Sequence, residues 1–140
     1  MRRLSVFAAV VTVVSMSSSG LAADGGQEAP TGKWEGHYVC HANKTGLTLT
    51  FEGTADELTA RASFYPHDEG PETDSGQFKV TGKMASDDKL VLESDEWIEQ
   101  PSGHVMVGFE GEIEKDGQRI RGELTGVRGC TTFSVEKVGT

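Results

Sequence analysis

The sequence predicts an all-β protein: a single antiparallel eight-stranded up-and-down β-barrel, with a β-sandwich as the alternative. Alternating or β-rich runs recur along the chain with turn residues between them, and no segment of helical periodicity follows the apolar N-terminus. Two cysteines, Cys40 and Cys130, lie near the two ends of this β-rich region. If they are bonded, the first and last strands are neighbours, as they are in a closed barrel.

Each expected strand is a short run of alternating or β-branched residues. The eight runs are Lys33–Cys40, Gly46–Glu52, Leu58–Tyr65, Gly76–Gly82, Lys89–Glu93, Val105–Glu114, Gln118–Gly126 and Thr131–Lys137.

Turn-forming residues separate these runs. We expect Asn43–Gly46 to close the first hairpin and Ala85–Asp88 the fourth. Asp116-Gly117 is a strong two-residue hairpin signal, because glycine tolerates positive φ and aspartate does so better than most residues.

The two cysteines are predicted to form a disulfide bond. In an up-and-down barrel the last strand returns antiparallel to the first, which places Cys40 beside Cys130. Two free thiols are the alternative, and an oxidising compartment disfavours them.

Side chains alternate between the two faces of a strand, and this alternation is compatible with two arrangements of the first and last strands. Phe133 and Val135 are expected to face the core, which puts Cys130 on the other face of a regular strand, whereas Trp34 and Cys40 share one face. Either a bulge near Cys130 shifts the register, or the aromatic face of the first strand points outward.

The N-terminus is typical of an export signal. Arg2 and Arg3 precede an apolar run and small residues, so residues 1–22 are expected to be a signal peptide. The apolar run is too short to span a membrane. Residues 23–31 are expected to be a flexible leader and residues 32–138 the barrel domain, and we expect the mature chain to be periplasmic or secreted.

The charge balance restricts the expected partners. The formal net charge is −9, and removal of the two signal-peptide arginines makes it −11. This excess of carboxylates disfavours nucleic acid and anionic membranes, and no membrane insertion is expected. A basic protein, a cation or simple solubility would each fit.

The opening of the first strand, Gly32-x-Trp34, resembles that of the calycin barrels, which include avidin-like proteins and lipocalins. The resemblance implies an eight-stranded barrel whose tryptophan plugs the base. In architecture the chain is also similar to small periplasmic inhibitors of lysozymes and of secreted metalloproteases.

No catalytic or metal-binding motif is recognised, so we expect no enzyme, no cofactor and no metal. His37 and His41 have a suggestive spacing, but residues four apart on a strand lie about 13 Å apart. The segment His67-Asp68-Glu69 resembles a solvated loop more than a metal site. Ser102-Gly103-His104 lacks an oxyanion-forming elbow.

Two longer loops are the best candidates for a binding site. Pro66–Ser75 is acidic, and Ser94–His104 holds a Trp-Ile pair among polar residues. Both follow odd-numbered strands, so they are expected to emerge at the same end of the barrel. Their expected partner-binding residues are Tyr65, His67, Trp97, Ile98, Glu99 and His104, with an acidic rim suited to a basic protein. For Trp97, a lid over the barrel end is the alternative.

The sequence therefore favours a non-enzymatic exported binding protein that binds or inhibits another protein, such as a basic lysozyme or protease. A carrier of a small apolar ligand in the barrel lumen is the second hypothesis, because small residues line several strands. An envelope-associated structural module is the third.

Overall fold

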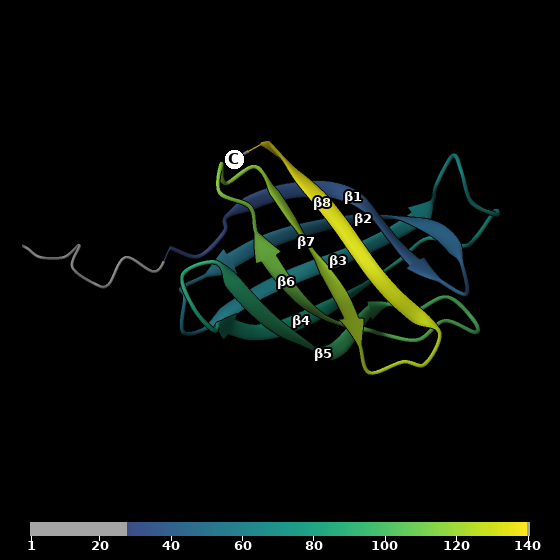
Figure 1. The fold of residues 1–140 in the computed structure, drawn as a ribbon. Helices are drawn as coiled ribbons and strands as arrows, with labels where there is room; N and C mark the ends of the chain where they lie inside the picture. The colour runs from purple at the N-terminus through teal and green to yellow at the C-terminus, as the bar shows by residue number, and fades with distance from the viewer. Residues whose placement is uncertain (1–27, 140) are drawn as a thin grey trace, which may run out of the picture.

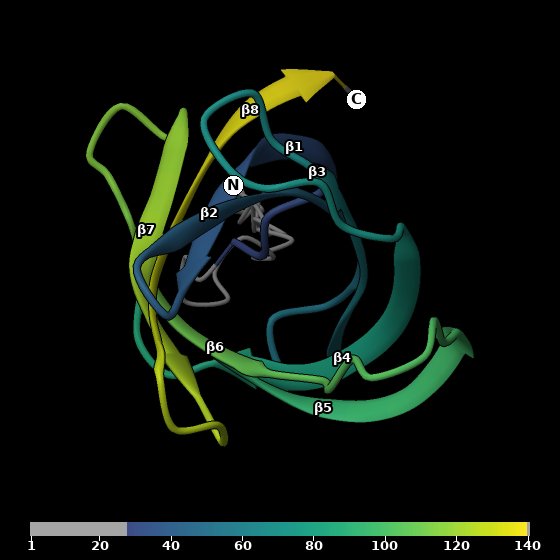
Figure 2. The ribbon, with the colours of Figure 1, turned by 90° about the vertical axis from the view of Figure 1, so that its right-hand side faces the viewer.

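The computed structural model describes residues 28–139, and they form a closed barrel of eight antiparallel strands (Figure 1). Each strand pairs with the next along the chain, and the last pairs with the first (Figure 2). The predicted barrel is therefore confirmed and the sandwich alternative is excluded. The strands are β1 Gly32–Cys40, β2 Asn43–Gly53, β3 Leu58–Pro66, β4 Gly76–Met84, β5 Lys89–Glu99, β6 Gly108–Ile113, β7 Arg119–Thr125 and β8 Cys130–Gly139.

The expected signal peptide and most of the expected leader lie outside the described residues. Within residues 28–139, no helix has the length and apolar character needed to cross a membrane.

Apolar side chains fill the barrel interior. Every strand contributes at least one buried apolar side chain to the interior, and the relative exposure of these buried side chains does not exceed 7%. Phe109 and Phe133 meet edge to face, with ring centroids 5.0 Å apart. The large buried side chains of the interior include Leu47, Leu49, Phe51, Phe64, Phe78, Leu90, Leu92, Phe109 and Leu124.

The predicted disulfide is present, and it joins the ends of the two strands that close the barrel. Cys40 on β1 pairs in register with Cys130 on β8 and is bonded to it. Tyr38 pairs with Phe133, so the register shifts between these two positions. This irregularity is a bulge near Cys130, which is the first of the two arrangements considered from the sequence. The aromatic face of β1 does not point outward, because Trp34 is buried in the core.

The first hairpin turn is two residues long and lies earlier than predicted. His41 and Ala42 form it with φ angles of +51° and +67°, and Cys40 pairs with Asn43. The prediction of a turn at Asn43–Gly46 was wrong, because these residues belong to β2. Two successive positive φ values are what a tight hairpin requires, although histidine and alanine rarely adopt them.

Strand β5 is longer than predicted. The segment Ser94–Glu99, expected to be loop, continues β5 and pairs with β4 as far as Gln77. Asp95 and Ile98 have no partner in that register, so each is a bulge residue. The two bulges break the alternation that marks a strand in sequence, and the prediction of a loop from Ser94 was wrong for this reason.

The predicted hairpin at Asp116-Gly117 is confirmed, although its loop exceeds two residues. The Glu114 amide donates to the Arg119 carbonyl at 2.8 Å, which leaves four residues in the loop. The Gly117 amide donates to the Glu114 carbonyl at 2.7 Å, and Gly117 has a φ of +72°. A β-turn followed by a left-handed glycine therefore joins β6 to β7.

Candidate functional site at the odd-strand end

The connections that follow β1, β3, β5 and β7 emerge together, and we call this end of the barrel the odd-strand end. It lies on the right in Figure 1. The two longest connections, residues 67–75 and 100–107, are both here, as the sequence predicted. The four histidines of the chain also lie at this end: His37 on β1, and His41, His67 and His104 in its connections.

The β5–β6 connection covers the core at this end. His104 stacks on Phe64, with ring centroids 5.1 Å apart and planes inclined by 24°. Trp97, at the end of β5, contacts Phe64 and Phe78 with centroid distances of 6.2 and 5.5 Å. Trp97 is half-buried and packs against the core. This placement corresponds to the lid alternative for Trp97.

The two long connections also contact each other. The Thr73 hydroxyl lies 3.5 Å from His104 Nε2. Gly76 begins β4 between the Phe64 ring and the Pro101 side chain, where a Cβ atom would come within 2.6 Å of both. Glycine at this position therefore permits the close approach that brings the connections together.

The first half of the β3–β4 connection rests on the β1–β2 hairpin. The Lys44 ammonium is 2.6 Å from Glu69 Oε1, and the ring centroids of His37 and His67 are 5.5 Å apart. The Glu69 amide donates to His67 Nδ1 at 2.9 Å. We call these four residues, His37, Lys44, His67 and Glu69, the loop clamp.

Ionisation within the loop clamp follows from its packing. Burial is the largest cause of a lowered pKa at His37, and the Lys44 ammonium and His67 lower it further while Glu69 opposes them. The hydrogen bond from Lys44 lowers the pKa of Glu69, and the Lys44 charge adds to it. The neutral form of His37 is therefore favoured in the folded protein.

The predicted partner-binding residues occupy different parts of this region. His104 and Trp97 cover the core, and His67 lies in the loop clamp. Tyr65 lies on the outer wall against Gly46, and its hydroxyl is 2.9 Å from Thr48 Oγ1.

Ile98 and Glu99 are both exposed at the end of β5. Ile98 is 51% exposed and borders an outer-wall depression of about 190 Å³ with Arg61 and Lys79. Glu99 pairs with Gln77 on β4. The six residues therefore share one end of the molecule without forming a single continuous cluster.

Exposed carboxylates surround the odd-strand end. They come from the β3–β4 connection and from the last residues of β5. One recess of about 350 Å³ is lined by Thr73, His104 and two carboxylates, those of Glu72 and Asp74. The exposed acidic residues of the two segments are Asp68, Glu69, Glu72, Asp74, Asp95, Glu96 and Glu99.

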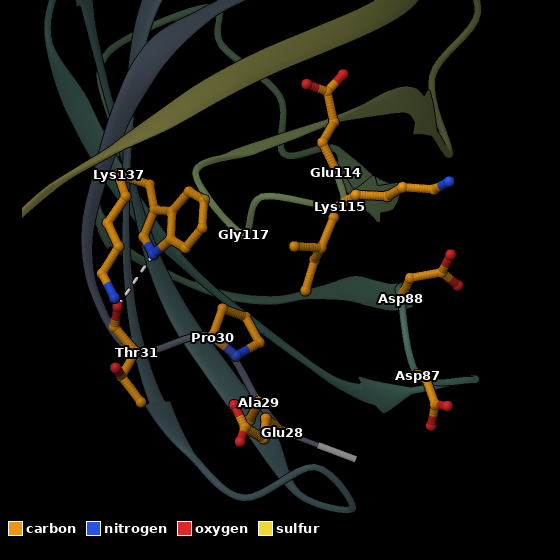
Figure 3. Close-up of a pocket in the computed structure, with 12 residues that line it drawn as sticks. Glu28, Ala29, Pro30, Thr31, Asp87, Asp88, Glu114, Lys115, Gly117 and Lys137 are labelled. Atoms are coloured by element: carbon orange, nitrogen blue, oxygen red, sulfur yellow. Dashed lines mark hydrogen bonds between the residues drawn. The ribbon is translucent and has the colours of Figure 1, made fainter. Parts of the chain in front are cut away.

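A second recess, which the sequence did not indicate, lies at the opposite end of the barrel (Figure 3). Its volume is about 380 Å³, and it separates residues 28–31 from the β4–β5 and β6–β7 connections. Trp34 forms its inner wall, is 2% exposed, and donates from Nε1 to the Thr31 carbonyl at 3.0 Å. Lys137 Nζ lies 6.0 Å from the Trp34 ring centroid. Trp34 thus plugs the base, as the calycin-like opening implied.

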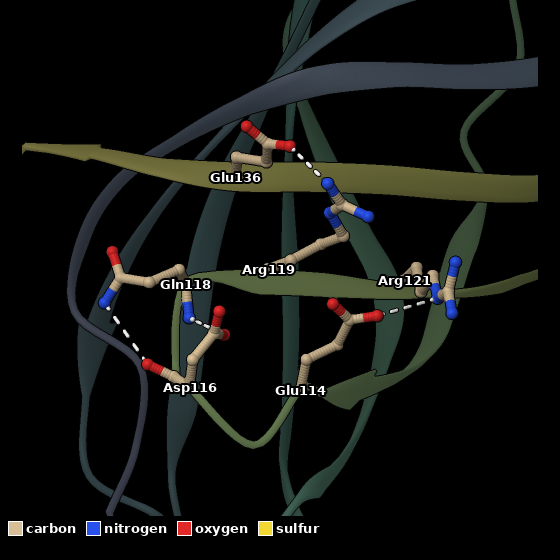
Figure 4. Close-up of polar contacts among 6 residues, drawn as sticks. All are labelled: Glu114, Asp116, Gln118, Arg119, Arg121 and Glu136. Atoms are coloured by element: carbon tan, nitrogen blue, oxygen red, sulfur yellow. Dashed lines mark hydrogen bonds and ion pairs between the residues drawn. The ribbon is translucent and has the colours of Figure 1, made fainter.

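Ion pairs on the outer wall beside this recess connect β7 to its neighbours (Figure 4). Arg119 bonds to Glu136 at 2.7 Å, and Arg121 to Glu114 at 3.0 Å. Their side chains are largely exposed, so solvent screening leaves each pair little effect on the free energy of unfolding. We therefore interpret this cluster as structural.

Within residues 28–139, no group of three or more histidine, cysteine or acidic residues has the arrangement needed to hold a metal ion. The Glu69 carboxylate of the His67-Asp68-Glu69 segment is instead bonded to Lys44.

No protein-family model matches the chain, and neither a curated protein nor a solved structure gives a significant match.

Proposed function

We propose that this protein is an exported, non-enzymatic binding protein that captures another protein, a basic hydrolase such as a lysozyme or protease, through the odd-strand end. The partner would be inhibited because the packed β3–β4 and β5–β6 connections cover the entrance to its active site. The observation that carries the proposal is the joining of two long connections into one surface over a filled barrel, with carboxylates of the β3–β4 connection and of the end of β5 around it.

The contacts between the connections support a surface that is formed before binding. His104 lies against both the core and Thr73, and the loop clamp fixes the first half of the β3–β4 connection. A surface that is already ordered loses less conformational entropy when a partner binds. Such a surface is suited to tight, shape-specific inhibition.

The charge distribution supports a basic partner. Carboxylates of both segments surround the surface, and the recess beside His104 offers Glu72 and Asp74 to a lysine or arginine side chain. Complementary charge of this kind raises the association rate and favours basic partners over acidic ones. We assign Glu72, Asp74, Glu99 and His104 to direct contact, and Trp97 to support of the surface from below.

The carrier hypothesis has less support. A ligand in the lumen would have to displace side chains such as Leu49, Phe64 and Phe109, which have at most 1% of their surface exposed. Core side chains are close-packed, and replacing that packing with a ligand cavity costs several kcal/mol.

Affinity capture with the oxidised mature protein tests the proposal. The native envelope or medium is passed over immobilised protein, and retained proteins and small molecules are identified by mass spectrometry. We expect a basic hydrolase to be retained and its activity to be inhibited by the purified protein. Glu72→Gln combined with Glu99→Gln should weaken retention at least tenfold, whereas Glu114→Gln at the opposite end should not. A bound small molecule without any protein partner would contradict the proposal.

A further inference from the structure

We propose that the loop clamp is a pH-dependent latch: acidification releases residues 67–70 of the β3–β4 connection from the β1–β2 hairpin, while residues 73–75 stay on the barrel. The latch would regulate the binding surface, and in that respect it rests on the proposed function. The opening itself is a property of the protein alone.

The contacts of the clamp require a neutral His67. The Glu69 amide donates to His67 Nδ1 at 2.9 Å, so Nδ1 must carry a lone pair and the proton must sit on Nε2. Protonation turns Nδ1 into a donor that faces the Glu69 N–H group. This hydrogen bond is therefore lost when His67 becomes an imidazolium.

A second imidazole and an ammonium lie against the same segment. The His37 ring centroid is 5.5 Å from that of His67, and Lys44 approaches from β2. Protonation of both rings would place three positive charges around the Glu69 carboxylate. Desolvation and the neighbouring positive groups already lower the pKa of His37. Protonation of these rings is therefore less favourable in the closed clamp than in the open form.

The other groups around the clamp do not compensate for this charge. Tyr65 on β3 is engaged with Thr48, and Ser134 on β8, the register partner of His37, is uncharged. Asp68 is exposed in the same connection. Glu69 is the carboxylate in direct contact with the clamp's positive groups, and Lys44 already occupies it.

The sign of the pH dependence follows from the lowered pKa of His37. At neutral pH both the open and closed forms carry a neutral ring, so the closed form keeps its full stability. As the pH falls below about 6.5, the usual histidine value, the open form gains a proton that the closed form resists. Acid therefore shifts the equilibrium toward the open form.

The far end of the connection responds differently. Gly76, which follows residues 73–75, is packed between the Phe64 ring and the Pro101 side chain, and neither of these groups titrates. Residues 73–75 therefore stay on the barrel in acid. The connection opens at the clamp and stays attached beside Gly76.

Amide hydrogen exchange followed by NMR tests the latch. Protection factors, corrected for the intrinsic exchange rate, are measured at pH 7.5 and pH 5.0. We expect protection of the Glu69 and Gly70 amides to fall at least about tenfold, because both amides lose their hydrogen bonds to His67 when the clamp opens. The Gly117 amide, bonded to Glu114 at the opposite end, is the internal reference and should not change. Equal protection of Glu69 and Gly70 at both pH values would overturn the proposal.

Two variants separate the latch from general acid sensitivity. His67→Asn keeps an acceptor near the position of Nδ1 but does not titrate, so protection should persist at pH 5.0. His41→Asn is the matched control, because His41 contacts Gly129 of the β7–β8 connection and should leave the pH response intact. A full acid response in His67→Asn would overturn the proposal.

The exchange experiment contains no partner, so its failure would leave the proposed function standing. Absence of partner binding at pH 7.5 would contradict the proposed function alone.

Discussion

Trp97 and Ile98 are adjacent residues with opposite environments, and their substitution separates support of the fold from contact with a partner. Trp97 packs on Phe64 and Phe78, whereas Ile98 is 51% exposed. We expect Trp97→Ala to lower the free energy of unfolding by about 2–3 kcal/mol, somewhat less than for a fully buried aromatic residue. Ile98→Ala should change it by less than about 0.5 kcal/mol. Urea unfolding measures both. Equal, small effects would mean that Trp97 does not pack as described.

Tyr38 gives a prediction at high pH. Burial raises the pKa of Tyr38 to about 12 from 10.0, and a hydrogen bond with Thr45 partly opposes that rise. The folded state therefore favours the neutral phenol. Its contribution to stability is present below pH 10.0 and is lost as the pH rises through about 12. Ultraviolet titration of a Tyr65→Phe variant isolates Tyr38, and a midpoint near 10 in the folded protein would contradict this placement.

At the scale of strands, a few glycines allow neighbouring backbones to approach closely. A Cβ atom on Gly36 of β1 would collide with the Ser134 carbonyl oxygen of β8 and lie 2.8 Å from Val135 Cα. Because backbone atoms cannot move aside easily, we expect Gly36→Ala to cost about 2 kcal/mol or more. Gly103→Ala is the control: its added Cβ meets nothing within 4 Å, and only its φ of +79° causes strain. A larger loss of thermal stability in Gly103→Ala than in Gly36→Ala would contradict this account.

The strands could be predicted from sequence wherever alternation is unbroken. Residues Leu58–Tyr65 alternate cleanly, and β3 begins and ends within one residue of its predicted bounds. Alternation fails at the bulges of Asp95 and Ile98, where an unpaired residue reverses the face of the next one. It also gives no sign of the His41-Ala42 turn, because the positive φ values there are imposed by the pairing of Cys40 with Asn43.

The candidate site was predictable only in part. Strand parity placed both long connections at one end, because this follows from topology alone. The loop clamp was not predictable, since it joins His67 to His37 and Glu69 to Lys44 across distant parts of the chain. The recess under Trp34 likewise depends on residues from four separate segments.

For the whole molecule, the disulfide is expected to be a large part of the stability. The bond between Cys40 and Cys130 spans a sequence separation of 90 residues. In the chain-entropy model a loop of this length stabilises the folded state by about 4–5 kcal/mol. Cys40→Ser combined with Cys130→Ser should therefore lower the Tm by roughly 15–20 °C. Calorimetry of the oxidised and double-serine proteins measures this, and a Tm difference of only a few degrees would show that strand pairing alone closes the barrel.

The central claim is that the odd-strand end binds a basic protein. Two variants test it most directly, each with two carboxylates replaced by lysine at one end of the barrel. One variant carries Glu72→Lys and Glu99→Lys, and a matched variant carries Asp88→Lys and Glu114→Lys at the opposite end. Both lose the same amount of negative charge. Binding to a panel of purified basic lysozymes and proteases is measured by titration calorimetry at pH 7.5. We predict that the oxidised wild-type protein and the opposite-end variant bind one of these hydrolases with similar affinity, and that the odd-strand variant binds it at least about a hundredfold more weakly. Equal weakening by the two variants, or no binding by the wild type, would contradict the claim.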